Sequence, residues 1–379
     1  MMSQTTFALP RARLRRLAPN SDNWLLWILA SAAVAFALIR PQPPMSELRL
    51  IDWNTVGALT GLMVLTKGME LSGALQIAAR RLLARATDLR QLVLLLVALA
   101  ASSSAVVTND ASLFLFVPLT KALAGNAQIP LARVVTYEAS AVNAGSALTP
   151  IGNPQNIFLW QQSGMDFARY TLMMVPTAGI MLTLLVATVI LLVPRTSIEK
   201  QMTGPTRSRS PHLFWTSLGL FGGFLLALEF HFLLPALLVV LIIYATLFRR
   251  VLADVDWALL LIIALMFVDL RQLADLPTVS SWFRALPLGS GLQTYVSAIV
   301  TSQLISNVPA AVVLERWAHH LPALASGVSI GGLGLCIGSL ANLIALRLAG
   351  APGGLWEFHR VSIPMLLISG AAGALLWST

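Results

Sequence analysis

The chain has few charged residues and one cysteine, and both shortages limit what it can be. Only 11% of its 379 residues are charged, against about 25% in a typical soluble protein. The single cysteine, Cys336, excludes a disulfide within the chain and a cysteine metal cluster. The sequence has no Gly-rich phosphate loop with Lys, no His-Glu-x-x-His and no Gly-x-Ser-x-Gly motif. We therefore expect no enzyme, no metal site and no cofactor.

Apolar residues, in contrast, make up 57% of the chain. They form several runs near the length of about 20 residues that crosses a bilayer as a helix. The fold class that we predict is an all-α polytopic membrane protein, with the lipid bilayer as its surroundings. The net charge of +9 would suit a nucleic acid, but the charges lie in short loops beside apolar segments, so we expect no nucleic-acid partner.

The N-terminal part resembles a signal peptide, because arginines precede an apolar run at residues 24–39. A chain with many later spans usually keeps such a segment as its first helix. We therefore favour a retained helix after a cytoplasmic basic tail.

One stretch between two apolar segments, residues 143–157, is too broken for an intact membrane helix. Pro150 and Pro154 lack an N–H, and Gly152 is free to take a positive φ. Asn153 before Pro154 is typical of an N-cap and the first position of a new helix. Unwound backbone at membrane depth must be buried in protein or line a wet cavity, which makes this break a candidate ion or solute site. The alternative is a surface loop between two ordinary helices.

The same order of features occurs twice: an Asp-Trp pair at a helix start, an amphipathic stretch, a hairpin with a hydroxyl-Asn tip, and an interrupted helix. Residues 151–157 align with residues 337–343, which pairs Gly152 with Gly338 and Asn156 with Asn342. The predicted organisation is a tail at 1–23, a first half at 24–194, a linker at 195–212 and a second half at 213–379. The first half is expected to contain a hairpin at about 91–124 and a broken helix at about 131–161. The second half is expected to contain a hairpin at about 290–320 and a broken helix at about 326–349.

The hairpins are predicted to be re-entrant, since neither arm of the first is a comfortable full span and its polar tip would be stranded if both arms crossed. With that assumption the chain crosses an odd number of times between Trp53 and Trp257, so the two repeats are inverted. Inverted repeats with paired interrupted helices are typical of secondary transporters. A cytoplasmic N-terminus then puts most of the 25 Lys and Arg inside, as the positive-inside rule requires. We expect an inner membrane protein with its N-terminus cytoplasmic and its C-terminus periplasmic.

Four polar interruptions should converge at the centre, two hairpin tips and two helix breaks. Each supplies a helix N-terminus, whose free N–H groups and dipole attract anions. The predicted substrate-binding residues are Thr108, Asn109, Gly152, Asn153, Asn156, Ser306, Asn307, Gly338, Ser339 and Asn342. Such helix ends with little fixed positive charge suit an anion that must bind and then leave.

Two carboxylates lie at the predicted membrane depth, where a carboxylate is costly and suggests function. Asp110 is a candidate proton carrier or cation ligand, or alternatively a cap of the returning helix. Glu138 is a coupling candidate or makes a structural hydrogen bond. Asn143 completes the predicted ion-coupling set, with a proton or sodium as the coupling ion.

At these residues the chain resembles the ion transporter superfamily, which includes divalent anion–sodium symporters, citrate permeases, arsenite-efflux permeases and related anion permeases. Thr108-Asn109-Asp110 is similar to the arsenite permeases' hairpin tip, and Ser306-Asn307-Val308-Pro309 to their second tip. The resemblance implies a homodimer in which a transport domain moves past a scaffold like an elevator. In the dicarboxylate symporters both hairpin tips resemble Ser-Asn-Thr. This chain has Asp110 and Val308 at the third positions of its tips, which argues against a dicarboxylate substrate.

The main hypothesis is a proton- or sodium-coupled secondary transporter of a small anion or oxyanion. Arsenite or antimonite efflux is one alternative, which the Asn-Asp tip favours. Sodium–proton exchange through Asp110 is another. A non-transporting membrane scaffold is the alternative of a different class.

Overall fold

The computed structural model describes residues 24–39, 43–106, 108–198, 210–230, 232–274 and 276–378. The chain divides into two compact units, Met1–Val56 with Asp256–Val279 and Gly57–Val255 with Ser280–Thr379. The predicted tail at 1–23 lies outside the described residues, as do residues 199–209 of the predicted linker. All residues predicted for the functional site belong to the larger unit.

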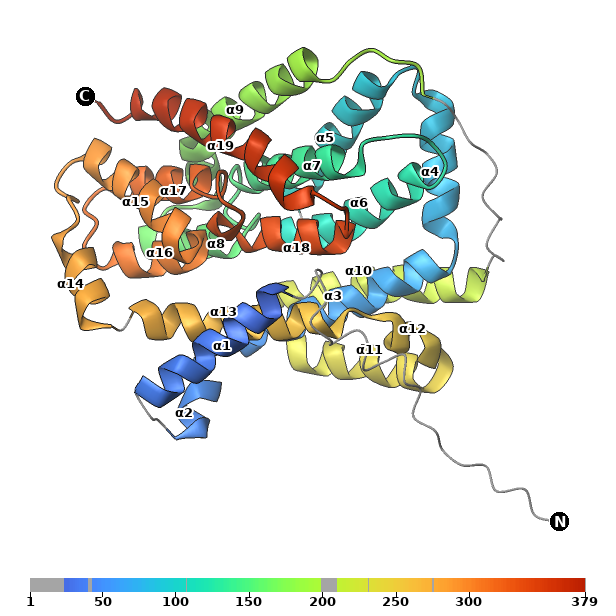
Figure 1. The fold of residues 1–379 in the computed structure, drawn as a ribbon, viewed down its shortest axis with the longest axis horizontal. Helices are drawn as coiled ribbons and strands as arrows, with labels where there is room; N and C mark the ends of the chain where they lie inside the picture. Colours follow the sequence, from blue (N-terminus) through green and yellow to red (C-terminus); the bar gives the residue numbers. More distant parts are fainter. Residues whose placement is uncertain are drawn as a thin grey trace. The chain divides into compact units, whose positions relative to one another are not determined.

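The smaller unit contains α1 (Trp24–Ile39), α2 (Pro44–Leu48) and α13 (Trp257–Ala274). Leu26 of α1 is buried against Ala258 and Ile262 of α13. The first predicted helix therefore forms with the expected bounds and packs on a helix far along the chain (Figure 1).

The structure confirms the all-α class, since the described residues form helices and no strand. Three helices among them are long and apolar enough to cross a bilayer: α5 (Leu89–Val106), α9 (Phe167–Leu192) and α10 (Pro211–Glu229). Large apolar side chains such as Leu191 and Leu234 lie exposed on helix surfaces, where lipid would cover them. The chain is a polytopic helical membrane protein.

The first half of the larger unit contains the predicted hairpin and broken helix. Its helices are α3 (Trp53–Leu71, which belongs to this unit from Gly57 on), α4 (Ala74–Arg85), α5, α6 (Asn109–Ala124), α7 (Leu131–Ser146), α8 (Pro154–Ser163) and α9. The hairpin is α5–α6 and the broken helix is α7–α8. α5 starts at Leu89 and has the length of a full span, so the expectation that neither hairpin arm is long enough to cross is not met by this arm.

The second half also contains a hairpin, followed by a broken helix and a long last helix. Its helices are α10, α11 (Leu233–Leu247), α12 (Arg249–Asp254), α14 (Pro277–Ala285, which belongs to this unit from Ser280 on), α15 (Gly291–Ile305), α16 (Asn307–Glu315), α17 (Leu321–Ile330), the 3₁₀ turn η2 (Cys336–Gly338), α18 (Leu340–Ala349) and α19 (Gly354–Ala374). α15–α16 is the second hairpin, and α17–α18 is the second broken helix. The hydrophobic pattern does not predict the short helix α12. This helix begins with two arginines directly after the apolar α11, where the pattern indicates only the end of an apolar span.

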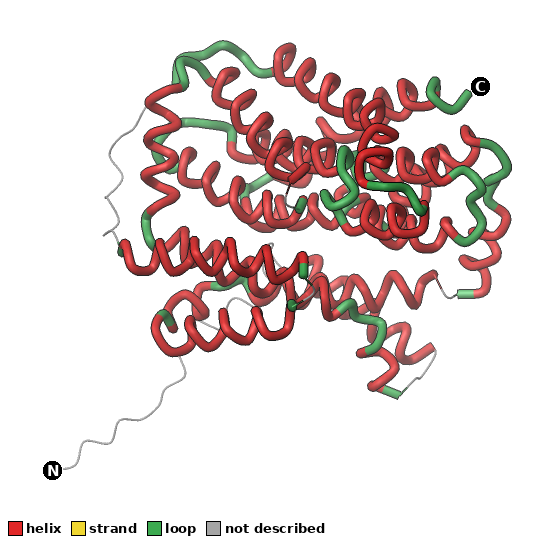
Figure 2. Tube along the Cα trace, turned by 180° about the vertical axis from the view of Figure 1, so that it is seen from behind, coloured by secondary structure: helices red, strands yellow, loops and turns green. Residues whose placement is uncertain are grey.

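Helix packing in the larger unit follows one pattern twice. Both arms of the first hairpin pack on α7, and both arms of the second pack on α17. The halves also cross over: α6 and α7 pack on α18, while α16 and α17 pack on α8. The irregular segments at the breaks are mostly buried and lie within this body of helices (Figure 2).

Two glycines explain how closely each hairpin approaches its broken helix. A Cβ on Gly145 of α7 would overlap Ala101 O and Ser104 Oγ of α5. A Cβ on Gly331, just after α17, would crowd the Ser302 side chain of α15 at 2.6–2.8 Å. A side chain at either position would push the hairpin away from the break.

Candidate functional site

Two asparagines hold the first helix break closed. Asn153 is the N-cap of α8, and its Oδ1 accepts the Asn156 N–H at 2.8 Å, as the Asn-Pro pattern predicts. The Asn156 amide nitrogen donates to three carbonyls at the end of α7 and in the break, at 3.1–3.3 Å. Gly152 packs so tightly on Ser146 that a Cβ there would overlap it. The break is a buried, hydrogen-bonded structure, which excludes the alternative of a surface loop.

The second break is closed by the equivalent amide. Asn342 Nδ2 donates to Gly332 O at 2.8 Å, as Asn156 Nδ2 donates to Ser146 O at 3.3 Å. The alignment of residues 151–157 with 337–343 pairs the two donors, and the same register carried upstream without a gap pairs the acceptors Ser146 and Gly332. The second break therefore repeats the contact that closes the first.

The alignment of residues 151–157 with 337–343 also pairs Asn153 with Ser339, and so predicts that Ser339 caps the helix that follows the second break. Ser339 occupies the N-cap position of α18 but makes no side-chain capping bond. Its hydroxyl donates instead to Asn143 Oδ1 at 3.0 Å. The equivalence of Asn153 and Ser339 as caps is therefore wrong in its chemistry, because the Ser339 side chain bonds to Asn143 and accepts no N–H of its own helix.

Asn143 links the two halves of the site. It lies on α7 and is buried, with 4% of its surface exposed. Its Nδ2 donates to Asn342 Oδ1 at 2.8 Å, while its Oδ1 accepts from Ser339. The sequence marks Asn143 as an ion-coupling residue, and the structure places it as a bridge between the first broken helix and the second.

The first hairpin tip rests on the first break. The Asn109 N–H donates to Gly152 O at 2.8 Å, and Thr108 caps α6 by accepting from the Ala111 N–H. Thr108, and not Asp110, is thus the cap of the returning helix. Asp110 lies in the first turn, and its Oδ1 is buried with no hydrogen-bond partner among the described residues.

The second hairpin tip meets the second break. Ser306 has a φ of 72°, the one positive φ of a described residue other than glycine, and it makes no capping bond. Asn307 is 2% exposed, and its Nδ2 lies 3.1 Å from where a Gly332 Cβ would be, with Asn143 Oδ1 at 3.4 Å from the same point. The amides of Asn143, Asn307 and Asn342 therefore gather around Gly332.

The predicted residues thus form two neighbouring groups. Asn109, Gly152, Asn153 and Asn156 surround the first break, and Asn143, Asn307, Ser339 and Asn342 surround the second. Ser146 joins them, because its hydroxyl donates to Asn143 O and accepts from Asn153 Nδ2. Gly338 belongs to the second break, where a Cβ would crowd Gly331 O at 2.7 Å.

Glu138 lies elsewhere on α7 and is fully buried. Thr120 of α6 donates to its Oε1 at 2.5 Å, and its Oε2 has no partner among the described residues. Of the two roles that the sequence allows for Glu138, this contact matches the structural hydrogen bond. It links the first hairpin to the first broken helix.

Gln303 is a residue of the site that the sequence patterns do not single out. Its side chain donates to Gly331 O and Leu333 O and accepts the Leu335 N–H, at 2.6–2.9 Å. Two α19 residues hold the same loop, since Ser362 accepts from the Gly334 N–H and His359 from the Cys336 N–H. The available signal is a glutamine in the last turn of an apolar hairpin arm, one turn before its tip.

The fold and these buried polar breaks define a polytopic helical transporter of the membrane. A profile described as "Citrate transporter" matches residues 23–323, most of the chain. The chain belongs to this citrate transporter family, whose members are transporters and not enzymes.

Relatives extend over nearly the whole chain. "Inner membrane protein YbiR" of Escherichia coli is 41% identical over 92% of this chain and 94% of its own length. "Uncharacterized transporter MJ0456" of Methanocaldococcus jannaschii is 28% identical over 86% and 90%. "Putative transporter arsB" of Dictyostelium discoideum is 24% identical over 37% of this chain and 24% of its own length. These relatives and the family indicate a multi-pass inner membrane protein.

Proposed function

We propose that this protein is a secondary active transporter that moves a small anion or oxyanion across the inner membrane, coupled to protons or sodium. The single observation that carries the proposal is the group of buried amides around Gly332, contributed by both breaks and by the second hairpin tip. Buried polar groups of this kind are costly in a membrane protein unless they serve a site.

An anion suits the chemistry of this region. α6, α8, α16 and α18 each begin at a tip or a break, so each presents first-turn N–H groups and the positive end of its dipole there. None of the residues predicted to bind substrate is Lys or Arg. Neutral donors hold an anion without the tight ion pair that would slow its release.

The coupling ion is proposed to bind beside the first break. The buried Oδ1 of Asp110 and the buried Oδ1 of Asn156 both lack partners among the described residues. Both are oxygen acceptors, which suit a proton or a small hard cation. Glu138 is the weaker candidate, because Thr120 already donates to it.

Inverted repeats support alternating access at this site. The repeated amide bond, the glycine contacts and the crossed packing of α6 on α18 and α16 on α8 are what two related halves would give. α10 packs on α11 and contacts α3 through Phe224 at Gly61, whereas the hairpins and breaks pack among themselves and on α9 and α19. This separation supports a moving transport domain and a scaffold, which we propose to act as an elevator in a homodimer with a cytoplasmic N-terminus and a periplasmic C-terminus.

The test is uptake by the purified protein in proteoliposomes. Labelled anions of several classes are offered under a sodium gradient, under a pH gradient and with neither. Uptake of at least one anion that depends on a gradient and is lost in Asn307→Ala is the expected result. No uptake of any anion under any gradient, from protein that is folded, would refute the proposal.

Arsenite or antimonite efflux is the second candidate, favoured by the Asn109-Asp110 tip, which resembles that of the arsenite permeases. The same proteoliposomes distinguish this candidate from anion transport. If a neutral arsenite species is the substrate, its transport should not be inhibited by added anions. Sodium–proton exchange through Asp110 predicts sodium-driven proton movement with no added solute.

A further inference from the structure

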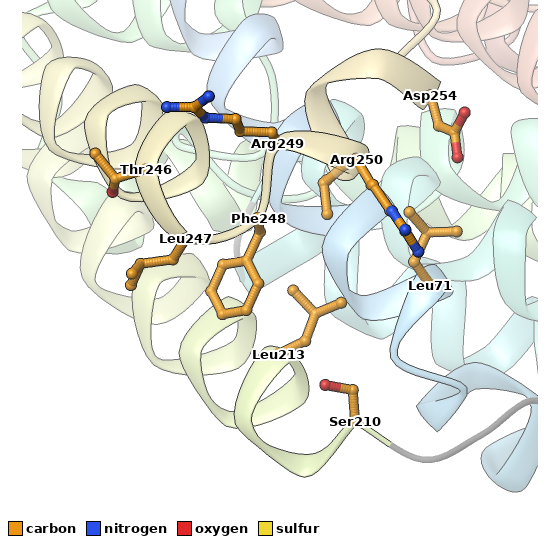
Figure 3. A pocket seen from close by; sticks show the side chains of 10 residues that line it. Leu71, Ser210, Leu213, Thr246, Leu247, Phe248, Arg249, Arg250 and Asp254 are labelled. Atoms are coloured by element: carbon orange, nitrogen blue, oxygen red, sulfur yellow. The ribbon is translucent and has the colours of Figure 1, made fainter. Parts of the chain in front are cut away.

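A cavity of about 600 Å³ lies in the larger unit, away from the breaks and hairpin tips. The structure forms it where the end of α3, the start of α10 and the end of α11 meet α12 (Figure 3). Its lining includes Leu71, Ser210, Leu213, Thr246, Phe248 and Arg250. None of these residues belongs to the proposed transport site, so the cavity needs its own explanation.

One side of the cavity is built to attract an anion. The Arg250 side chain runs along the wall toward Leu71 (Figure 3) and forms no ion pair among the described residues. α10 starts at the same place, with Ser210 as its N-cap and Pro211 at its first position. The Ser210 hydroxyl makes no capping bond, which leaves it free to act as a donor beside the helix N-terminus.

Arg249 plays a different part. Its Nε donates to Ala245 O at 2.7 Å, at the carboxyl end of α11. In Figure 3 its guanidinium points away from Arg250. It adds positive charge at the rim while Arg250 faces the cavity.

The other side of the cavity is apolar. Phe248 and Leu213 lie next to one another (Figure 3), and Leu71 and Leu247 extend the same wall. Leu247 is 69% exposed, although a leucine gains free energy when it is covered. Tyr244 packs behind this wall. Its hydroxyl is hydrogen-bonded to Ser217 at 2.6 Å, and its ring contacts the Phe248 ring in a tilted arrangement.

The position of the cavity fits the boundary of the hydrocarbon layer. α10 and α11 are strongly apolar, and the chain turns from apolar to basic where α11 gives way to α12. Arginines at such a boundary face the lipid headgroups, and their phosphates are the anions concentrated there. The apolar wall continues from the anion-attracting side of the cavity. A phospholipid bound with its phosphate on that side would therefore lay the upper part of an acyl chain along the wall.

We propose that this cavity binds a glycerophospholipid, with its phosphate between Arg250 and the α10 N-terminus and an acyl chain along Phe248 and Leu213. Asp254 on the rim provides an acceptor for a headgroup that carries an ammonium or hydroxyl donor. A free phosphate would satisfy Arg250 but leave the apolar wall uncovered. The proposal rests on the membrane location of the protein and is independent of its transport substrate.

The experiment measures lipid binding to delipidated protein in detergent, by native mass spectrometry and by thermal stability. The probes are phosphatidylethanolamine and phosphatidylglycerol, with glycerol phosphate and inorganic phosphate as the soluble sources of the same group. We expect the phospholipids to bind and stabilise the protein, and the soluble phosphates to do neither at the same concentration.

Two variants test the two sides of the cavity. Arg250→Gln removes the charge and should weaken phospholipid binding by about tenfold or more, the usual effect of losing one charge-assisted hydrogen bond. Thr246→Trp fills the cavity from an exposed position and should have the same effect with both arginines intact. Arg169→Gln, an exposed arginine on α9 outside the cavity, is the matched control and should bind as the unaltered protein does.

Three results would overturn the proposal. Equal lipid binding by Arg250→Gln and Arg169→Gln would show that the cavity is not the lipid site. Equal stabilisation by inorganic phosphate would make it a site for a free anion. Phospholipid binding unchanged in Thr246→Trp would place the acyl chain elsewhere.

Discussion

Replacing Asn143 by alanine tests whether the two breaks depend on one another. The substitution removes the hydrogen bonds from Nδ2 to Asn342 and from Ser339 to Oδ1, at 2.8 and 3.0 Å. It leaves Asn342 Oδ1 and Ser339 Oγ buried without another partner in the described part of the chain; each residue is 1% exposed. The damage therefore falls on the second half, although the substitution is in the first.

The size of the effect follows from those atoms. Each buried polar group left without a partner costs about 1–3 kcal/mol, and two are left. Some of this is recovered if water enters, so we expect Asn143→Ala to lower the free energy of unfolding by about 2–4 kcal/mol. Equilibrium unfolding in mixed micelles, followed by the fluorescence of the ten tryptophans, measures the difference.

Ser329 supplies the matched control. The alignment of the breaks places it opposite Asn143 in the second half, where it is 2% exposed and its hydroxyl has no partner among the described residues. Ser329→Ala removes a hydroxyl that already lacks a partner, so it should not lower the free energy of unfolding. Equal destabilisation by Asn143→Ala and Ser329→Ala would refute the bridging role of Asn143.

Three further predictions follow from the same region. Asp110→Asn should abolish gradient-driven uptake in proteoliposomes while leaving the unfolding curve intact; unchanged uptake removes Asp110 from the mechanism. Gly145→Ala should lower the free energy of unfolding by about 1–3 kcal/mol in the same assay, because its Cβ would overlap α5. Gly222→Ala, with no atom within 4 Å of its Cβ, is the control and should be neutral or stabilising. Equal effects of the two substitutions would contradict the close packing at Gly145. In a Cys336→Ser background, Arg169→Cys and Arg360→Cys lie exposed near the starts of α9 and α19 and should react with a membrane-impermeant maleimide from opposite sides of the membrane; labelling of both from one side would contradict inverted repeats.

The sequence predicts the helix breaks well because their signals are local. Pro154 fixes its own φ and Asn153 caps the next residues, so the start of α8 follows from two neighbouring residues. The all-α class follows equally directly from the long apolar runs, and α1 has the predicted bounds.

The partners of the polar side chains could not be predicted in this way. Ser339 has the local pattern of a cap but bonds to Asn143, nearly two hundred residues earlier in the chain. Gln303 holds the second break only because α15 packs on that loop. Such contacts depend on which helices meet, and no local propensity carries that information.

Hairpin length was also misjudged from the sequence. The first hairpin was expected to begin at about residue 91, whereas α5 begins at Leu89 and runs to Val106, the length of a full span. Ser104 remains helical because its hydroxyl donates to Ala101 O one turn back, which satisfies it inside an apolar environment.

The central claim is that the two breaks and the hairpin tips hold a small anion together with a coupling ion. The most direct measurement is a thermal-stability panel of citrate, other carboxylates, sulfate, phosphate and metalloid oxyanions, each with and without sodium and at two pH values. A ligand at 100 times its Kd stabilises the folded state by about 2.7 kcal/mol. The account predicts that at least one anion raises the Tm in a sodium- or pH-dependent way, and that Asn307→Ala abolishes the rise. Stabilisation that is equal in Asn307→Ala, or absent for every anion, would contradict it.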